Sequence, residues 1–187
     1  MRLFVALEIP SAVRDNLTSL LRSLRAITKE PRWVRAENLH VTLKFLGEVT
    51  ERKLDAIRTA LGEIHSEQAV TLEFRGLDFF PNEKHPRVFW AGIEASTNLK
   101  TLAADIEGAM EKLRIAREQR EFSPHLTLAR FERAHVPEAL RKAIAENSER
   151  EFGSLRTNEF HLIQSKLRPS GAEYTTLASF RFAPGVE

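Results

Sequence analysis

The chain has 187 residues, 42% hydrophobic and 29% charged, the proportions of a soluble globular protein long enough to bury a sizeable core. Its formal net charge of +2 excludes a polycation that would coat nucleic acid indiscriminately. The absence of cysteine excludes disulfides, thiolate catalysis and cysteine-ligated zinc, and it is compatible with the cytoplasmic location that we expect.

The N-terminal half alternates short apolar strands with amphipathic helices. The apolar run at 3–7 predicts a buried strand, because it is too short for a signal sequence and Glu8 follows it. Apolar residues at helical spacing predict one helix from Ser11 that ends before Pro31, and another that begins near Thr50. Further strands are expected at 33–34, 40–46, 70–74 and 87–93, and no segment predicts a membrane span.

The C-terminal half continues this alternation. A helix is expected from Thr97 with apolar positions as far as Leu113, and another from Pro137 through Ile144. Strands are expected at 125–129, 157–164 and 174–182. A doubly wound parallel sheet is the competing architecture, but no glycine-rich phosphate loop follows the first strand.

One short pattern occurs twice: His40-Val41-Thr42-Leu43-Lys44 returns 85 residues later as His125-Leu126-Thr127-Leu128-Ala129. In a strand, successive side chains point to opposite faces, so each histidine shares a face with its threonine. Each copy is followed by a short loop and a helix, which indicates an internal duplication. We therefore predict an α+β fold in which residues 1–187 form a single bilobal domain. Its two similar lobes are expected to meet at a groove, with sheets that are mainly antiparallel.

Two imidazoles across such a cleft suit acid–base chemistry on a phosphate ester. Histidine has an ordinary pKa of about 6.5, so one ring can accept a proton while the other donates one. In-line displacement places the attacking and departing oxygens on opposite sides of phosphorus. Thr42 and Thr127 could donate hydrogen bonds to the non-bridging oxygens. Arginines near the second motif, Arg130 among them, suit phosphate binding or are ordinary solvated charges.

Other uses of these residues are weighed against that hypothesis. A single histidine or threonine on a strand is more often structural, and the repetition is what favours His40 and His125. A zinc site would need a third ligand, and neither motif has a histidine or acid two residues on, so we expect no metal and no cofactor. The sequence has no glycine-flanked nucleophilic serine. The remaining histidines, His65, His85, His135 and His161, are predicted to be non-catalytic.

The chain resembles the two-histidine (2H) phosphoesterase superfamily, and within it the bacterial and archaeal RNA 2′,3′-cyclic phosphodiesterases, also called 2′-5′ RNA ligases. The likeness covers almost the whole chain. The residues that carry it lie at 2–6, 33–34, 38–47, 87–90, 122–130 and 165–174.

That resemblance implies two lobes related by a pseudo-twofold axis, each an antiparallel sheet with helices on its outer face, with the active-site cleft between them. It also implies metal-independent hydrolysis of a terminal 2′,3′-cyclic phosphate on RNA to a 2′-phosphomonoester, with reversible 2′-5′ ligation in members of the family. It implies that His40 donates a proton to the 3′ oxygen, that His125 activates water, and that Thr42 and Thr127 bind the phosphate. It also makes Arg130 a candidate substrate contact. In a regular strand the fifth residue after His125 would face away from it, so this role requires a bulge or a strand end.

The expected partners are RNA 3′ ends or nucleotides bearing a 2′,3′-cyclic phosphate, with no membrane and a monomer by default. Phe4, Phe45 and Trp90 are expected to pack in the core, with base stacking as the alternative. Two other functions remain open. One is a phosphodiesterase acting on a small cyclic phosphate such as ADP-ribose 1″,2″-cyclic phosphate, and the other is a non-catalytic RNA-binding module.

Overall fold

The computed structural model describes residues 1–82, 84–133 and 135–185. The strands are β1 (Arg2–Glu8), β2 (Arg32–Trp33), β3 (His40–Glu48), β4 (Val70–Phe80), β5 (Val88–Ala95), β6 (His125–Arg130), β7 (Glu151–Thr157), β8 (Glu159–Arg168) and β9 (Gly171–Arg181). The α-helices are α1 (Ser11–Ile27), α2 (Leu54–Gly62), α3 (Thr97–Lys112) and α4 (Glu138–Glu146). Short 3₁₀ helices lie at Ala36–Asn38 (η1) and Glu51–Lys53 (η2).

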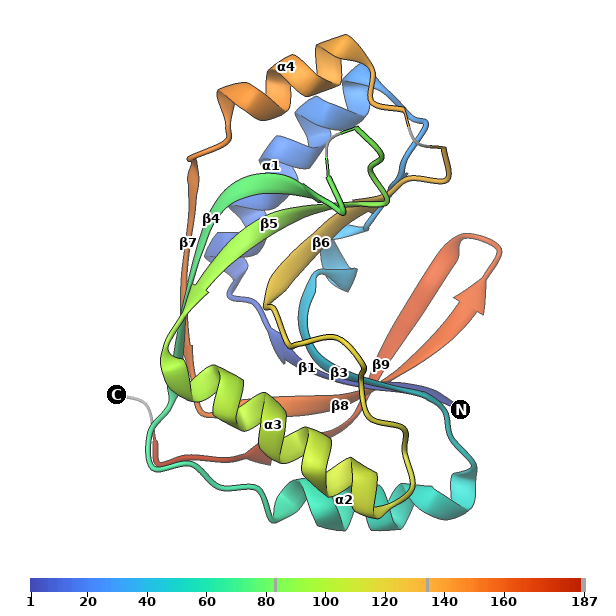
Figure 1. Cartoon of the computed structure of the whole chain (residues 1–187), viewed down its shortest axis with the longest axis vertical. Coiled ribbons are helices and arrows are strands. Elements are labelled where there is room, and N and C mark those ends of the chain that lie inside the picture. The colour runs from blue at the N-terminus through green and yellow to red at the C-terminus, as the bar shows by residue number, and fades with distance from the viewer. Residues whose placement is uncertain (83, 134, 186–187) are drawn as a thin grey trace.

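The strands form two antiparallel sheets, one in the order β3-β1-β8-β9 and the other in the order β2-β6-β5-β4-β7. Helices α2 and α3 lie against the first sheet, while α1 packs on the second sheet beside β7 and α4 packs on α1 (Figure 1). The predicted α+β fold with helix-covered antiparallel sheets is confirmed. The parallel alternative is wrong, since every strand pairing in the described part of the chain is antiparallel.

Neither sheet is built from one half of the chain. The first sheet takes two strands from the N-terminal end and two from the C-terminal end, and α1 leaves it to cover the other sheet. The strand β1 is central, between β3 and β8, which explains its unbroken apolar run. Leu3, Val5 and Leu7 join the main core, whereas Phe4 and Ala6 on the opposite face join a small cluster with other residues of the first sheet.

The elements differ from the sequence prediction mainly at the edges of the sheets. The strand β7 was not expected, because only Phe152 of its seven residues is fully buried and the apolar alternation is correspondingly weak. The strand expected from residue 157 begins instead at Glu159. Strand β4 extends to Phe80, well past the predicted end, and Leu113 lies just beyond the end of α3.

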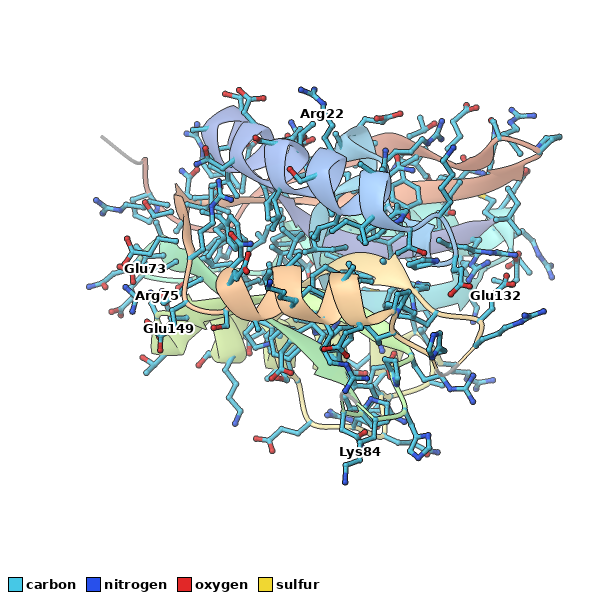
Figure 2. The ribbon with its side chains drawn as sticks, turned by 90° about the horizontal axis from the view of Figure 1, so that it is seen from above. Arg22, Glu73, Arg75, Lys84, Glu132 and Glu149 are labelled. Carbon is cyan, nitrogen blue, oxygen red and sulfur yellow. The ribbon has the colours of Figure 1, made fainter. Side chains whose placement is uncertain are left out.

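A long hairpin formed by β8 and β9 projects beyond the rest of the first sheet (Figure 1). The backbone of this hairpin is tied to η1 and the residue before it, because Arg35 and Asn38 both donate hydrogen bonds to the Ala172 carbonyl, at 2.5 and 2.8 Å. Leu167, near its tip, is 75% exposed. Charged side chains such as Arg22 on α1 point outward around the molecule (Figure 2). None of the helices, over the residues described, combines the length and apolarity needed to cross a bilayer.

Candidate active site

Each repeated histidine is the first residue of a strand, one in each sheet. His40 begins β3, opposite Glu8 of β1, and His125 begins β6, opposite Gly92 of β5. Strands β3 and β6 lie close together although they belong to different sheets, with Cα atoms of residue pairs within 8 Å of one another. The two strands that carry the motifs therefore lie near each other where the two sheets meet.

Both imidazoles are held by the same local contact. Nδ1 of His40 lies 3.1 Å from the Asn38 carbonyl oxygen, and Nδ1 of His125 lies 2.9 Å from the Ser123 carbonyl oxygen. A carbonyl can only accept, so each hydrogen bond requires a proton on Nδ1. The second nitrogen, Nε2, then carries either a lone pair or a proton. Each ring can serve as a base when neutral and as an acid when charged.

The two motif strands also share a bulge at the same position. In β3 the register places Thr42 opposite Ala6 and Lys44 opposite Val5, so Leu43 is the extra residue. In β6 the register places Thr127 opposite Trp90 and Ala129 opposite Phe89, so Leu128 is the extra residue. The equivalent interruption in both lobes supports the duplication inferred from the sequence.

This bulge changes which side chains share the face of the histidines. Thr127 pairs with Trp90 and Arg130 pairs with Val88, and these two partners lie two residues apart on β5, so they point the same way. Arg130 thus lies on the same face of the strand as Thr127 and His125. The bulge that its role as a substrate contact requires is therefore present. Arg130 is exposed and has no ion-pair partner within 1–82, 84–133 and 135–185.

The equivalent position in the first lobe is Phe45, opposite Phe4 and 54% exposed. The expectation that Phe45 packs in the core is therefore wrong. Phe4 is buried, as expected, and its ring packs on that of Tyr174 with centroids 5.0 Å apart. Trp90 is half-buried, and its ring centroid lies 6.1 Å from that of His125.

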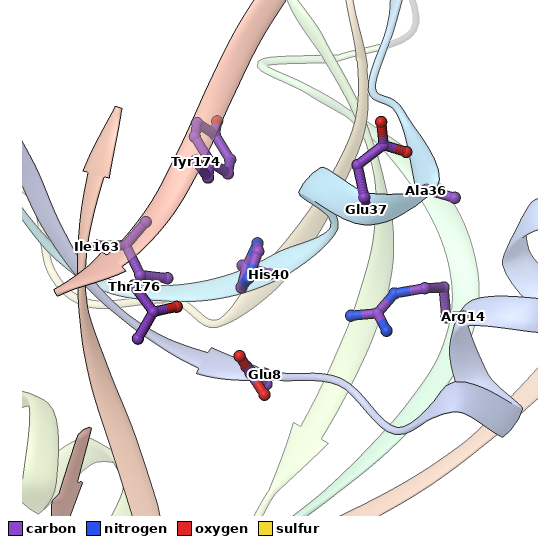
Figure 3. Close-up of a pocket in the computed structure, with 8 residues that line it drawn as sticks. All are labelled: Glu8, Arg14, Ala36, Glu37, His40, Ile163, Tyr174 and Thr176. Atoms are coloured by element: carbon purple, nitrogen blue, oxygen red, sulfur yellow. The ribbon is translucent and has the colours of Figure 1, made fainter. Parts of the chain in front are cut away.

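A cavity of about 460 Å³ opens beside His40 (Figure 3). It is lined by Glu8, Arg14, Ala36, Glu37, His40, Ile163, Tyr174 and Thr176. Glu8, Arg14, Tyr174 and Thr176 were not expected at the site from the sequence. Glu8 stands out as a charge at the end of an apolar strand, and Tyr174 lies in the stretch that carries the family resemblance. Arg14, Tyr174 and Thr176 reach the site through the packing of α1 and β9.

Burial is the largest influence on His40 and lowers its pKa below the ordinary value of 6.5. The hydrogen bond to the Asn38 carbonyl and the Glu8 carboxylate raise the pKa. The Arg14 guanidinium and His161 lower it. His40 therefore has a carboxylate that stabilises its charged form, while His125, which is exposed, faces Gly92 at the equivalent position.

His161 lies in β8 opposite Ala6 and is buried, with Nδ1 2.8 Å from the hydroxyl of Ser179. It lies near His40 but outside the set that lines the cavity. Among the residues with assigned positions, no three histidine, aspartate or glutamate side chains are grouped closely enough to hold a metal ion.

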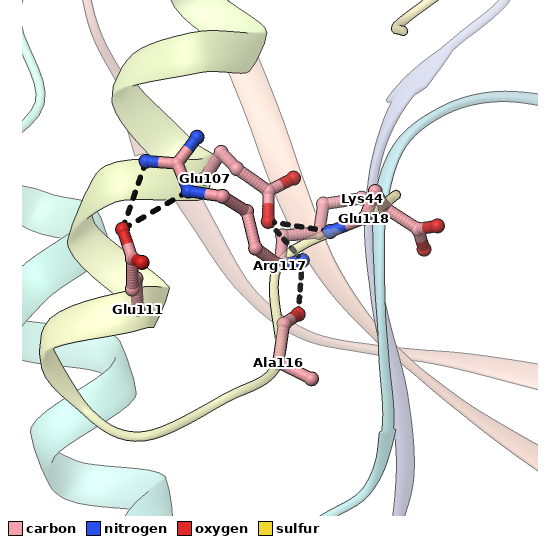
Figure 4. Close-up of polar contacts among 6 residues, drawn as sticks. All are labelled: Lys44, Glu107, Glu111, Ala116, Arg117 and Glu118. Carbon is pink, nitrogen blue, oxygen red and sulfur yellow. Dashed lines mark hydrogen bonds and ion pairs between the residues drawn. The ribbon is translucent and has the colours of Figure 1, made fainter. Parts of the chain in front are cut away.

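A buried ion pair supports the loop that leads into β6. The side chain of Lys44 has no exposed surface and its Nζ lies 2.6 Å from Oε1 of Glu107 on α3. Lys44 also donates to the Ala116 carbonyl at 3.0 Å, and the Glu118 amide donates to the same Glu107 oxygen at 3.1 Å (Figure 4). The charged group thus binds β3, α3 and the segment before His125 together.

The sequence similarity of this chain to known proteins extends over both motifs. The family described as "LigT like Phosphoesterase" matches residues 7–90 and 93–174. An RNA 2′,3′-cyclic phosphodiesterase of Archaeoglobus fulgidus is 36% identical over 182 residues, covering 96% of this chain and 99% of that protein. One from Methanothermobacter thermautotrophicus is 31% identical over 182 residues, covering 97% and 98%.

Solved structures are similar to this chain over nearly its whole length. A crystal structure of a Thermus thermophilus protein superposes with a TM-score of 0.80 at 33% identity, covering 96% of this chain and 97% of the other. The crystal structure of E. coli LigT complexed with NADP+ has a TM-score of 0.76 at 27% identity and covers 98% of both chains.

Proposed function

Because this chain belongs to the LigT-like phosphoesterase family, we propose that it is an RNA 2′,3′-cyclic phosphodiesterase that opens a terminal cyclic phosphate to a 2′-phosphomonoester. The observation that carries the proposal is the matched environment of two imidazoles on strands that meet between the sheets. Each ring has Nδ1 on a backbone carbonyl and leaves Nε2 to exchange a proton. Full-length relatives that carry this name support the choice of substrate.

In the proposed reaction, Nε2 of His125 takes a proton from water as the water oxygen attacks phosphorus. The bond from phosphorus to the 3′ oxygen breaks, and Nε2 of His40 gives that oxygen its proton. One proton is taken up and one is released, so each histidine ends in the opposite protonation state. Burial favours the neutral form of His40, and Glu8 offsets part of that effect in favour of the charged ring that a proton donor must have.

Thr42 and Thr127 are proposed to donate hydrogen bonds to the non-bridging oxygens, since each shares a strand face with its histidine. Arg130, brought to that face by the bulge, would add a charge-assisted hydrogen bond to the phosphate. These contacts hold phosphorus between the two rings and stabilise the charge that develops during displacement.

The same groups would also support 2′-5′ ligation, in which a 5′-hydroxyl of a second RNA takes the place of water. His125 would accept the proton of that hydroxyl as its oxygen attacks phosphorus. The bond to the 3′ oxygen would again break with a proton from His40, which leaves a 2′-5′ linkage. Water is abundant, so hydrolysis dominates unless a bound RNA end positions the hydroxyl.

The test is to incubate the protein with adenosine 2′,3′-cyclic phosphate in the presence of EDTA and to identify the product by chromatography. Formation of adenosine 2′-phosphate is expected. A 3′-phosphate product would contradict the assigned leaving oxygen, and loss of turnover on chelation would contradict the metal-independent mechanism. No turnover of any cyclic phosphate, with RNA binding retained, would favour the non-catalytic binding module.

A further inference from the structure

The cavity beside His40 contains a cation that the proposed chemistry does not use. Arg14, in the first turn of α1, extends its guanidinium toward the space between His40 and Glu8 (Figure 3). Its Nε is buried without a hydrogen-bond partner, and no carboxylate of the described residues lies within ion-pair distance of it. A buried donor without an acceptor is costly, which indicates a site shaped for an incoming acceptor.

Neither of the two carboxylates that line the cavity, Glu8 and Glu37, lies within ion-pair distance of Arg14. Glu37, on the cavity wall, pairs with Arg35 at 3.6 Å. Glu8 acts on His40 and stabilises its charged form. Helix α1 has no acidic residue in its first turn and no side-chain cap, so its N-terminus adds positive potential at the same end of the cavity. The ligand expected at Arg14 is therefore an anion.

We propose that Arg14 binds the 5′-phosphate of the nucleotide that carries the cyclic phosphate, that is, the linkage to the preceding nucleotide of the RNA. The inference rests on the proposed function, in which His40 protonates the 3′ oxygen and so faces the ribose. A cavity of about 460 Å³ on that side is large enough for a nucleoside. Arg14 lies across this cavity from His40, where the far side of the ribose would place the next phosphate.

The substrate class follows from this contact. The enzyme should prefer an oligonucleotide end over a nucleoside cyclic phosphate, because only the former offers an anion to Arg14. A charge-assisted hydrogen bond of this kind corresponds to about a tenfold or greater preference. Tyr174, on the wall of the same cavity, has a ring centroid 5.8 Å from that of His40 and limits the position of the nucleoside.

The kinetic test compares kcat/KM for adenosine 2′,3′-cyclic phosphate and for the dinucleotide ApA ending in the same cyclic phosphate. The unmodified protein should prefer the dinucleotide about tenfold, and Arg14→Gln should abolish that preference, mainly through KM. Removal of Arg14 also changes the surroundings of His40, but this affects both substrates equally and cancels in their ratio. The control is Arg22→Gln on the outer face of α1, which should leave the ratio unchanged (Figure 2).

A binding test separates this inference from the proposed function, since it requires no turnover. Calorimetry should show adenosine 2′,5′-bisphosphate binding about tenfold more tightly than adenosine 2′-phosphate, with the difference lost in Arg14→Gln. Equal affinities in the unmodified protein, or a difference that survives the substitution, would overturn the role of Arg14. Failure to hydrolyse either cyclic phosphate would count against the proposed function, while these affinities would still decide the inference.

Discussion

His40 and His125 share a backbone acceptor at Nδ1 but differ in what lies across the strand. Glu8 faces His40, whereas Gly92 faces His125 at the equivalent place. Burial lowers the pKa of His40, and the opposing carboxylate offsets part of that effect. The two rings therefore make the same kind of hydrogen bond but have different neighbours across the strand.

We expect His40 to titrate below 6.5 in the free protein and Glu8→Gln to lower its pKa further, because a nearby carboxylate stabilises the imidazolium. As pH falls through the pKa of His40, the ring gains its proton, so the substitution reduces the fraction of charged His40 at any given pH near that value. NMR titration of the ring protons would measure this. The control Glu37→Gln lines the same cavity and should leave the pKa of His40 in place; an unchanged pKa in Glu8→Gln would contradict the role of Glu8.

The β-bulge is the feature of a single element that most affects the site. An extra residue at Leu43 and at Leu128 reverses the alternation of the strand after each threonine. In one lobe this exposes Phe45 beside Phe4, and in the other it turns Arg130 toward the face of His125. The same backbone irregularity thus gives an exposed phenylalanine in one lobe and an exposed arginine in the other.

The ion pair between Lys44 and Glu107 gives a prediction at the level of the elements it joins. Lys44→Met leaves the Glu107 carboxylate, which is 14% exposed, without its cation, so the free energy of unfolding should fall by about 3 kcal/mol. The matched control is Lys100→Met, whose pair with Glu121 is 67% and 77% exposed, so its loss should lower the free energy of unfolding far less. Urea denaturation measures both, and equal effects would contradict a structural role for the buried pair.

Sequence patterns predicted most of the elements and the faces of the motif strands, because apolar periodicity reports burial directly. They failed where a strand lies at an edge, as in β7, whose seven residues bury only one apolar side chain fully. They also failed for the cavity beside His40. Arg14 and Tyr174 stand 26 residues before and 134 residues after His40 in the sequence, and only the packing of α1 and β9 brings them to the same cavity. Local patterns carry no information about such distant neighbours.

In the proposed mechanism, the two sheets each supply one of the two groups that act in the reaction. His40→Ala and His125→Ala should each lower kcat by at least about a hundredfold, the scale of a general acid or base. Because both groups act in one displacement, the double variant should be nearly as active as the slower single variant. Single-turnover assays with a cyclic nucleotide would measure these rates. A double variant whose losses multiply would contradict this coupling and would mean that the two histidines contribute independently to the rate.

The interleaving of the two sheets also affects how the chain matures on the ribosome. Ala6 of β1 pairs with His161 of β8, so a strand that emerges first waits for a neighbour made 155 residues later. At ordinary rates of translation this interval is on the order of ten seconds. During that time the apolar edge of β1 on the β8 side has no native partner. Completion of the first sheet, and of the cavity built on it, must therefore wait until β8 and β9 have been made.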